Sequence, residues 1–370
     1  MAKVRVVLVV LAAIFALSFS SRAWAQVKLL RDNTGWAFRV GLQWTNNDGE
    51  DWQTIAPHAP GWSMVNAFFL NTSNGWALLQ KGRQALCCQF ALASTDNHGL
   101  SWSVKPMKLP IWWSPNREVF GGGGTIDFVA PMHGWVDLQF EGSLAVNGGA
   151  LFSTDDGGQT WRHVKKDPGV FGTVRFITPK EGWVGGGPGY ELYGTHDGGK
   201  TWEKVNLPPP PGLGPTSTRN YYLPTFQGPG HGYLPVSFFH PATSSETFVL
   251  FQTVDGGKTW KPTMGVLQCP GCSGVVPLTV ADSTLMVVEK TSDYRAVLVK
   301  ATPDGRVEKA SGSFGRGTSV ALSFLTPQHG WLYDSGDVLV TTDGGETWTN
   351  PSPVRHGVGH RVLPRKPPQR

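Results

Sequence analysis

One octapeptide recurs six times along this chain and constrains its fold more than any other sequence feature. Its pattern is Ser/Thr-x-Asp-x-Gly-x-Thr-Trp, called the box below. The copies begin at Thr45, Thr95, Thr154, Thr195, Thr253 and Thr341. Asn47 and Asn97 replace the Asp in the first two copies, and a worn trace without the Trp begins at Thr302. Such self-similarity indicates a repeat architecture.

A second signal keeps step with the box. Gly-Trp or Gly-Tyr precedes each full copy, at Trp36, Trp76, Trp135, Trp183, Tyr233 and Trp331. Leu285 stands at this position in the degenerate unit, and an apolar stretch such as Phe128-Val129-Ala130-Pro131 lies just upstream of the aromatic. Counting the degenerate unit gives seven repeats of about 40 to 59 residues, the period of propeller blades.

Each repeat predicts four short antiparallel strands. The apolar stretch is strand A, the Gly-Trp segment is strand B, the run before the box is strand C, and strand D follows the box Trp. We expect the box Asp or Asn to accept hydrogen bonds from backbone N–H groups two residues on, and the box Trp to fill the wedge between blades. The structural box residues are Asn47, Asn97, Asp156, Asp197, Asp255 and Asp343, with Trp52, Trp102, Trp161, Trp202, Trp260 and Trp348.

The predicted fold class is all-β: one seven-bladed β-propeller of four-stranded antiparallel blades over residues 26–350. Blade six lacks a complete box. Blade one begins with its own strand A, from Val27 to Arg31, so we expect the ring to close without a shared blade unless the C-terminal tail adds a strand. Radial stacking of this kind protects the strand edges of each blade.

The box repeats resemble the Asp-box repeats of sialidases and sortilin-type receptors. The segment EGWVGGGPGYELYGTHDGGKTW from Glu181 is most similar to the photosystem II assembly and stability factor family. The resemblance covers about residues 27–350 and implies an exported protein that acts as an assembly scaffold. It is specific for fold and weak for function, because function in such folds depends on the loops.

The two ends of the chain differ from the repeats. Lys3 and Arg5, an apolar run, and Ala23-Trp24-Ala25 predict a signal peptide over residues 1–25, cleaved after Ala25, and therefore export. Residues 351–370 form a basic, Pro-rich tail that we expect to be disordered, with weak contact to an anionic membrane surface as one alternative. Both ends carry much of the positive charge, so we expect no nucleic-acid binding by the body.

Function is expected on the face opposite the boxes, where the D–A and B–C loops emerge. Trp112, Trp113 and Arg117 lie in one D–A loop, and Arg219, Tyr221 and Tyr222 end another. Trp, Tyr and Arg are enriched in binding hot spots, so the hypothesis is a monomeric, non-catalytic scaffold that binds a protein partner. Packing of Trp112 and Trp113 onto the blades is the alternative.

An enzymatic interpretation competes with the scaffold. A glycan-binding or glycoside-hydrolysing propeller could use Trp112 and Trp113 to stack sugar, with a carboxylate pair as acid and base. The loop carboxylates available are Glu141, Glu246, Asp293 and Asp337. The Arg-Ile-Pro motif of sialidases is absent, so no catalytic residue is assigned. We expect no cofactor and no metal, because the boxes lack the ligand spacing of a calcium loop.

The four cysteines fall in two loops. Cys87 and Cys88 are adjacent in a B–C loop, and Cys269 and Cys272 form a Cys-x-x-Cys in a D–A loop. Export favours disulfides. Four cysteines allow three connectivities, so the sequence leaves open both local bridges and cross-pairing between the loops. A redox motif or a zinc site at the Cys-x-x-Cys also remains open.

Overall fold

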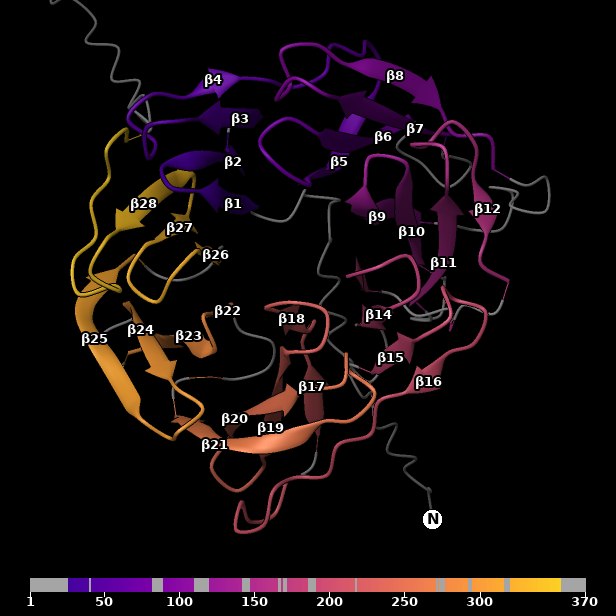
Figure 1. Ribbon diagram of the computed structural model, residues 1–370. Coiled ribbons are helices and arrows are strands. Elements are labelled where there is room, and N and C mark those ends of the chain that lie inside the picture. Colours follow the sequence, from indigo (N-terminus) through magenta and orange to yellow (C-terminus); the bar gives the residue numbers. More distant parts are fainter. Residues whose placement is uncertain are drawn as a thin grey trace, which may run out of the picture.

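The computed structural model describes residues 26–353, except 40, 82–88, 110–119, 142–146, 166–167, 169–171, 186–190, 217, 271, 273–276, 292–294 and 316–319. Seven antiparallel sheets are arranged as blades around a central axis (Figure 1). The chain is thus an all-β, seven-bladed β-propeller, as the repeat predicted. The described part of the chain holds no helix that is long and apolar enough to cross a bilayer.

The first four blades each have four strands, in chain order from the axis outward. Blade 1 contains β1 (Val27–Arg31), β2 (Thr34–Phe38), β3 (Leu42–Thr45) and β4 (Gln53–Thr54); blade 2 contains β5 (Ser63–Phe69), β6 (Gly75–Lys81), β7 (Gln89–Thr95) and β8 (Ser103–Pro106). Blade 3 contains β9 (Phe120–Ala130), β10 (His133–Glu141), β11 (Asn147–Thr154) and β12 (Arg162–His163); blade 4 contains β13 (Thr173–Phe176), β14 (Gly182–Gly185), β15 (Leu192–Thr195) and β16 (Glu203–Lys204).

The last three blades depart more from the repeat. Blade 5 has β17 (Arg219–Tyr221), β18 (Thr225–Phe226), β19 (Gly232–His240), β20 (Ser245–Thr253) and β21 (Lys261–Cys269); blade 6 has β22 (Leu278–Ala281), β23 (Thr284–Lys290), β24 (Ala296–Ala301) and β25 (Val307–Phe314). Blade 7 has β26 (Val320–Phe324), β27 (Gly330–Asp334) and β28 (Asp337–Thr341). In blade 5 both β17 and β18 pair with β19, so strand A is split in two. In blade 7 the outer strand is reduced to the bridge between Val340 and Thr349.

The box closes its turn differently from the sequence expectation. In the third box the Asp156 Oδ1 atom accepts a hydrogen bond from the N–H of Thr160, four residues on, at 2.9 Å. The N–H two residues on from the first Thr belongs to Asp156 and donates to the Thr154 hydroxyl, which also accepts from Gly158 N at 2.8 Å. The expectation of a bond to N–H groups two residues beyond the Asp was wrong, because the buried first Thr meets that need.

The Asp side chain is held by Thr hydroxyls as well as by backbone. Thr154 Oγ1 donates to Asp156 Oδ1 at 2.8 Å and Thr160 Oγ1 donates to Oδ2 at 2.5 Å. These bonds, with Thr160 first, lower the pKa of Asp156 to about 2, because they favour the charged form. Where Asn replaces Asp, its amide donates instead: Asn47 Nδ2 to Asp51 and Asn97 Nδ2 to Ser101.

The Gly-Trp motif and the Phe of strand A pack as one repeated unit. A Cβ atom on Gly134 would lie 2.4 Å from the ring of Phe128, so only Gly leaves room for that ring. The other side of the Phe128 ring stacks on Trp76 of the preceding blade at 3.8 Å between centroids. Trp135 stacks on Phe176 of the following blade in the same way, at 3.6 Å. Each Phe therefore joins its own blade to the one before it.

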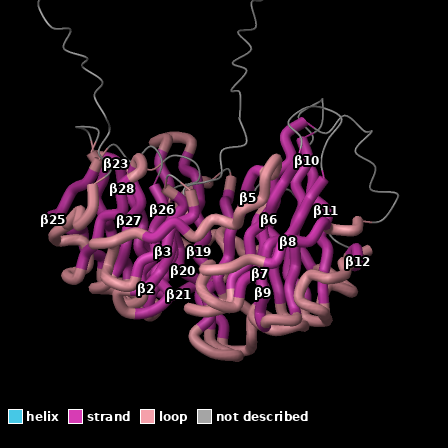
Figure 2. Tube along the Cα trace, turned by 90° about the horizontal axis from the view of Figure 1, so that it is seen from above, coloured by secondary structure: helices cyan, strands magenta, loops and turns pink. Residues whose placement is uncertain are grey.

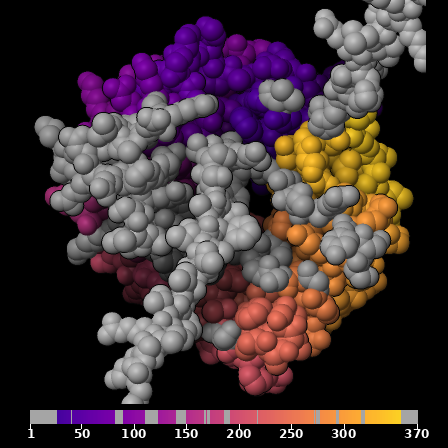
Figure 3. Space-filling model, turned by 180° about the vertical axis from the view of Figure 1, so that it is seen from behind, coloured from indigo at the N-terminus to yellow at the C-terminus, as the bar shows by residue number. Residues whose placement is uncertain are grey.

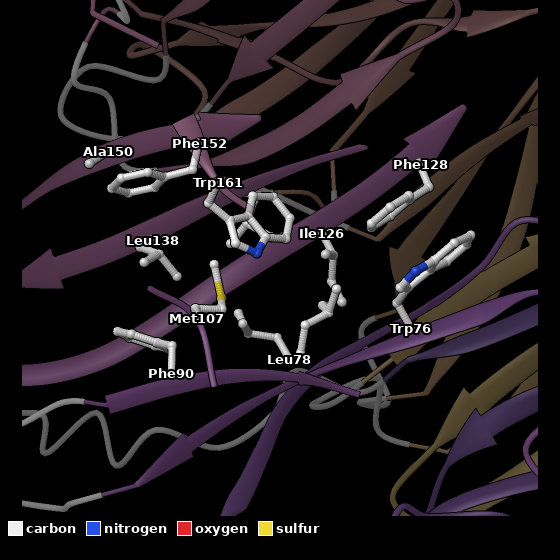
Figure 4. Packing of buried hydrophobic residues seen from close by; sticks show 12 residues of the cluster. Trp76, Leu78, Phe90, Met107, Ile126, Phe128, Leu138, Ala150, Phe152 and Trp161 are labelled. Atoms are coloured by element: carbon white, nitrogen blue, oxygen red, sulfur yellow. The ribbon is translucent and has the colours of Figure 1, made fainter. Parts of the chain in front are cut away.

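The box Trp fills the wedge between blades, as expected. Trp161 lies in a buried cluster with Leu78 and Phe90 of blade 2 and Phe128 and Phe152 of blade 3 (Figure 4). Trp102 Nε1 donates to the carbonyl of Ile55 in blade 1 at 2.6 Å. Burial of aromatic rings at each junction stabilises the stack of blades.

The ring closes where blade 7 meets blade 1, and blade 1 supplies all four of its own strands. Ser323 Oγ accepts from Leu29 N at 2.9 Å. Asp48, at the fourth position of the first box, accepts from Trp331 Nε1 at 2.9 Å and lies 3.2 Å from His329 Nε2. This junction is called the seam below. No shared blade is needed within the described chain, which agrees with the expectation from the strand A of blade one.

Candidate functional site

The strands run between two faces of the ring (Figure 2). The boxes and A–B turns share one face, since Gly157 N donates to the A–B turn carbonyl of Met132 at 3.0 Å. The B–C and D–A connections therefore leave the opposite face, called the loop face below. Figure 3 shows this face, with the indigo first blade beside the yellow last blade and a hollow near the middle of the ring.

Three of the six predicted partner-binding residues lie outside the described residues: Trp112, Trp113 and Arg117. The other three are described and make internal contacts. Arg219 Nη1 donates to Asn206 Oδ1 at 2.9 Å and to the carbonyl of Leu207 at 2.7 Å. Tyr221 OH accepts from Leu207 N at 2.9 Å. Both side chains thus hold the segment that precedes them against blade 5.

Tyr222 packs between blades 5 and 6. Its ring centroid lies 6.2 Å from that of Phe248, and it flanks the buried cluster that contains Leu285. Arg219, Tyr221 and Tyr222 are all half-buried. Direct contact of these side chains with a partner stays a prediction.

A disulfide joins Cys269 and Cys272 in the D–A connection after β21. Both residues are buried, and Cys272 N also donates to the carbonyl of Cys269 at 3.2 Å. The bridge packs in the cluster between blades 5 and 6. Of the pairings left open by the sequence, the structure has the local one at this loop, while Cys87 and Cys88 lie outside the described residues.

The loop carboxylates considered for catalysis do not form a site in the described part of the chain. Glu246 is buried on β20 of blade 5, and Asp337 lies on β28 of blade 7 with blade 6 between them. Asp337 pairs with Arg39 at 3.8 Å. Asp293 and the side chain of Glu141 lie outside what the structure describes. Among the described residues no group of three or more His, Cys, Asp or Glu could hold a metal.

A charged cluster that sequence reasoning missed lies near the axis. Asp127 of β9 is buried, its Oδ2 accepts from Phe176 N at 2.5 Å, and its Oδ1 lies 3.7 Å from Arg175 Nη1. Burial raises the pKa of Asp127 to about 6, although Arg175 and the bond from Phe176 oppose this shift. Burial lowers the pKa of Lys28 on β1 to about 8, and the Arg175 guanidinium adds to this shift.

The available signal for this cluster was positional. Lys28, Asp127 and Arg175 are each paired with the aromatic of their own Gly-Trp: Lys28 with Trp36, Asp127 with Trp135 and Arg175 with Trp183. A charge inside an otherwise apolar inner strand is unusual. Aligning the repeats on the Gly-Trp motif would have placed all three at one level of the ring.

Part of the chain matches the model of a known protein family. Residues 123–217 match the family of the photosynthesis system II assembly factor YCF48. The match begins in β9 of blade 3, contains blade 4, and ends before β17. No curated protein matches the chain.

Solved structures confirm the fold. The GH74 xyloglucanase from Xanthomonas campestris superimposes with a TM-score of 0.59 at 12% identity, over 88% of this chain and 52% of that protein. The BP39L lectin from Burkholderia pseudomallei gives 0.51 at 14% identity, over 89% of this chain and 97% of that one. The chain spans about half the length of the xyloglucanase. At such identities the likeness is one of fold, since one fold hosts many functions.

Proposed function

We propose that this protein is an exported, non-catalytic scaffold that binds a protein partner through the loop face, in the manner of an assembly factor. The observation that carries the proposal is the match of residues 123–217 to the YCF48 assembly factor family. The matched segment includes blade 4 and the proline-rich connection that Arg219 and Tyr221 hold. The rest of the ring serves as a rigid support for these loops.

The physical argument for the loop face rests on what each face offers. On the box face the carboxylates of the boxes are engaged within their own turns, as Asp156 is by Thr160, and the turns are short. On the loop face, rigid strands carry longer connections, which is the usual arrangement of a binding surface. Trp112, Trp113 and Arg117 belong to one of the two longest D–A connections and supply residue types common in hot spots.

Export is part of the same proposal. The leader over residues 1–25 supports it, and the Cys269–Cys272 bridge is consistent with an oxidising compartment. The partner is then another exported protein or the exposed part of a membrane complex. The basic tail beyond residue 350 would add a weak attraction to an anionic surface.

Affinity capture from the exported fraction of the native host tests the proposal. The bait is the mature chain, and the test variant is Trp112→Ala/Trp113→Ala. The matched control is Leu100→Ala/Met132→Ala, which removes two exposed apolar side chains from the box face. A partner retained by the wild type and the control but lost by the test variant supports the scaffold. Loss in the control alone, or turnover on a panel of glycosides without a captured protein, would overturn it.

A further inference from the structure

The inner strands of the seven blades form a level at which one residue per blade is paired with the Gly-Trp aromatic or its equivalent. We call this level the axial layer. Its members are Lys28, Phe68, Asp127, Arg175, Thr225, Val280 and Ser323. The inner strands surround the axis in Figure 1, so these residues encircle the middle of the ring.

Short side chains in the axial layer reach the next blade. Ser323 accepts from the N–H of Leu29 in blade 1, and Asp127 accepts from the N–H of Phe176 in blade 4. These acceptors satisfy inner-strand N–H groups that would otherwise face the axis unpaired. Lys28 and Arg175 have no acceptor atom, so they cannot satisfy an N–H group of the next blade in this way.

Lys28 lies on β1, the innermost strand of blade 1. Its side chain is exposed to solvent, yet the surrounding protein is the main cause of its lowered pKa. A side chain that lies in a water-filled space enclosed by the ring would be both exposed to water and surrounded by protein. Arg175 acts on it from blade 4, almost opposite blade 1, and the Arg175 side chain is itself 42% exposed.

The charge of the inner strands is unbalanced. The described inner strands, β1, β5, β9, β13, β17, β18, β22 and β26, carry the cations Lys28, Arg31, Arg175 and Arg219, and Asp127 is their one carboxylate. Asp127 is already engaged by Phe176 N and Arg175. Arg219 is engaged by Asn206 and Leu207. Arg31 ends β1 beside the A–B turn, away from the axial layer. Lys28 and the part of Arg175 that does not face Asp127 remain as two cations in the axial layer.

We infer that Lys28 and Arg175 form a binding site for a small divalent oxyanion in the axial channel. The ammonium of Lys28 and the guanidinium of Arg175 would approach the anion from opposite walls, which relieves their mutual repulsion. The Arg175 fork supplies directed donors, and Lys28 supplies a compact charge. This inference is independent of the proposed function, because it uses neither the loop-face residues nor a protein partner.

Chemical labelling of Lys28 tests the site in the mature, folded chain. Acetylation by an amine-reactive reagent at pH 8 is followed by peptide mass spectrometry, with sodium sulfate added at an ionic strength matched by sodium chloride. We expect sulfate to slow acetylation of Lys28 several-fold and in a saturable manner, while exposed Lys105 on β8 reacts unchanged. In Arg175→Gln the protection should be lost. Equal rates in sulfate and chloride, or protection that survives Arg175→Gln, would overturn the inference.

Thermal unfolding gives a second readout that does not need Lys28 to react. At low millimolar concentration and constant ionic strength, sulfate should raise the Tm of the wild type in a saturable manner, as a ligand of the native state does. This saturable increment, unlike the general salting-out effect of sulfate, should vanish in Lys28→Met. Lys105→Met, the matched control, should keep it. Phosphate and succinate arms separate an inorganic oxyanion from a dicarboxylate. An increment that persists in Lys28→Met contradicts the site even if Arg175→Gln fails to fold.

Discussion

Replacement of Asp127 by Asn should stabilise the protein at neutral pH. The carboxyl is buried beside the axis and its pKa is raised from 3.8 to about 6, mainly by burial. A raised pKa means that the folded state binds the proton more tightly than the unfolded state. The ionised form therefore destabilises the fold, with no effect below about pH 4 and the full effect above about pH 6.

The size of the effect follows from the two pKa values. A difference of about two pKa units corresponds to ~3 kcal/mol, an upper bound because Asn also alters the contact with Arg175. Asn keeps an oxygen that can accept from Phe176 N, so the link between blades 3 and 4 is retained. Asp127→Asn should thus exceed the wild type in free energy of unfolding by up to about 3 kcal/mol at pH 7.5 and by little at pH 4.

Urea unfolding at half-unit steps between pH 4 and pH 8 measures this difference. Other titrating groups cancel when wild type and variant are compared at each pH. Asp32→Asn, on an exposed turn of blade 1, controls for the loss of one negative charge. A difference between wild type and Asp127→Asn that stays constant with pH, or that falls as pH rises, would refute the reasoning.

Three further perturbations probe the seam, the boxes and the disulfide. Asp48→Gly removes the acceptor of Trp331 Nε1, which should lower the free energy of unfolding by about 1–3 kcal/mol; relief of the left-handed backbone of Asp48 (φ 54°) offsets part of this loss. Hydrogen exchange should become faster in β1 and β27. It should not become faster there in the control His98→Gly, which changes the same box position in blade 2. Asn47→Asp places a carboxylate against the carboxylate of Asp51 and should lower the Tm. Asp156→Asn should change the Tm less. A larger loss of Tm in Asp156→Asn than in Asn47→Asp would contradict the idea that each box residue suits the residue four positions on. Cys269→Ser should cost ~2 kcal/mol in unfolding free energy by loop entropy, and four free thiols in the denatured, unreduced wild type would contradict the bridge.

The repeat made the fold predictable because two motifs mark each blade independently. Six boxes and six Gly-aromatic pairs located the strands, and aligning Leu285 with the aromatics located the blade without a complete box. The stacking of Trp76 on Phe128 of the next blade explains why these motifs travel together. The sequence did not predict the role of the first box Thr. Its hydroxyl accepts two backbone hydrogen bonds in the structure, and a single Thr in a sequence gives no sign of this.

The axial layer could not be predicted from one repeat at a time. Lys28 and Arg175 are more than a hundred residues apart in the sequence, and each alone is consistent with a strand residue that faces solvent. Arg175 acts on Lys28 only once blades 1 and 4 are arranged around the axis. The loop-face residues Arg219 and Tyr221 illustrate the converse: residue types suited to binding also serve to hold a proline-rich segment.

Because the seam joins the first blade to the last, the ring can close only at the end of the protein's synthesis. Asp48 and Trp331 are 283 residues apart in the sequence. One side of blade 1 therefore stays uncovered until the ribosome has released nearly the whole chain. Contacts of such long sequence separation form slowly, because the loop entropy is lost before they contribute. Until then the exposed edges of blades 1 and 7 are open to aggregation or to capture by a chaperone.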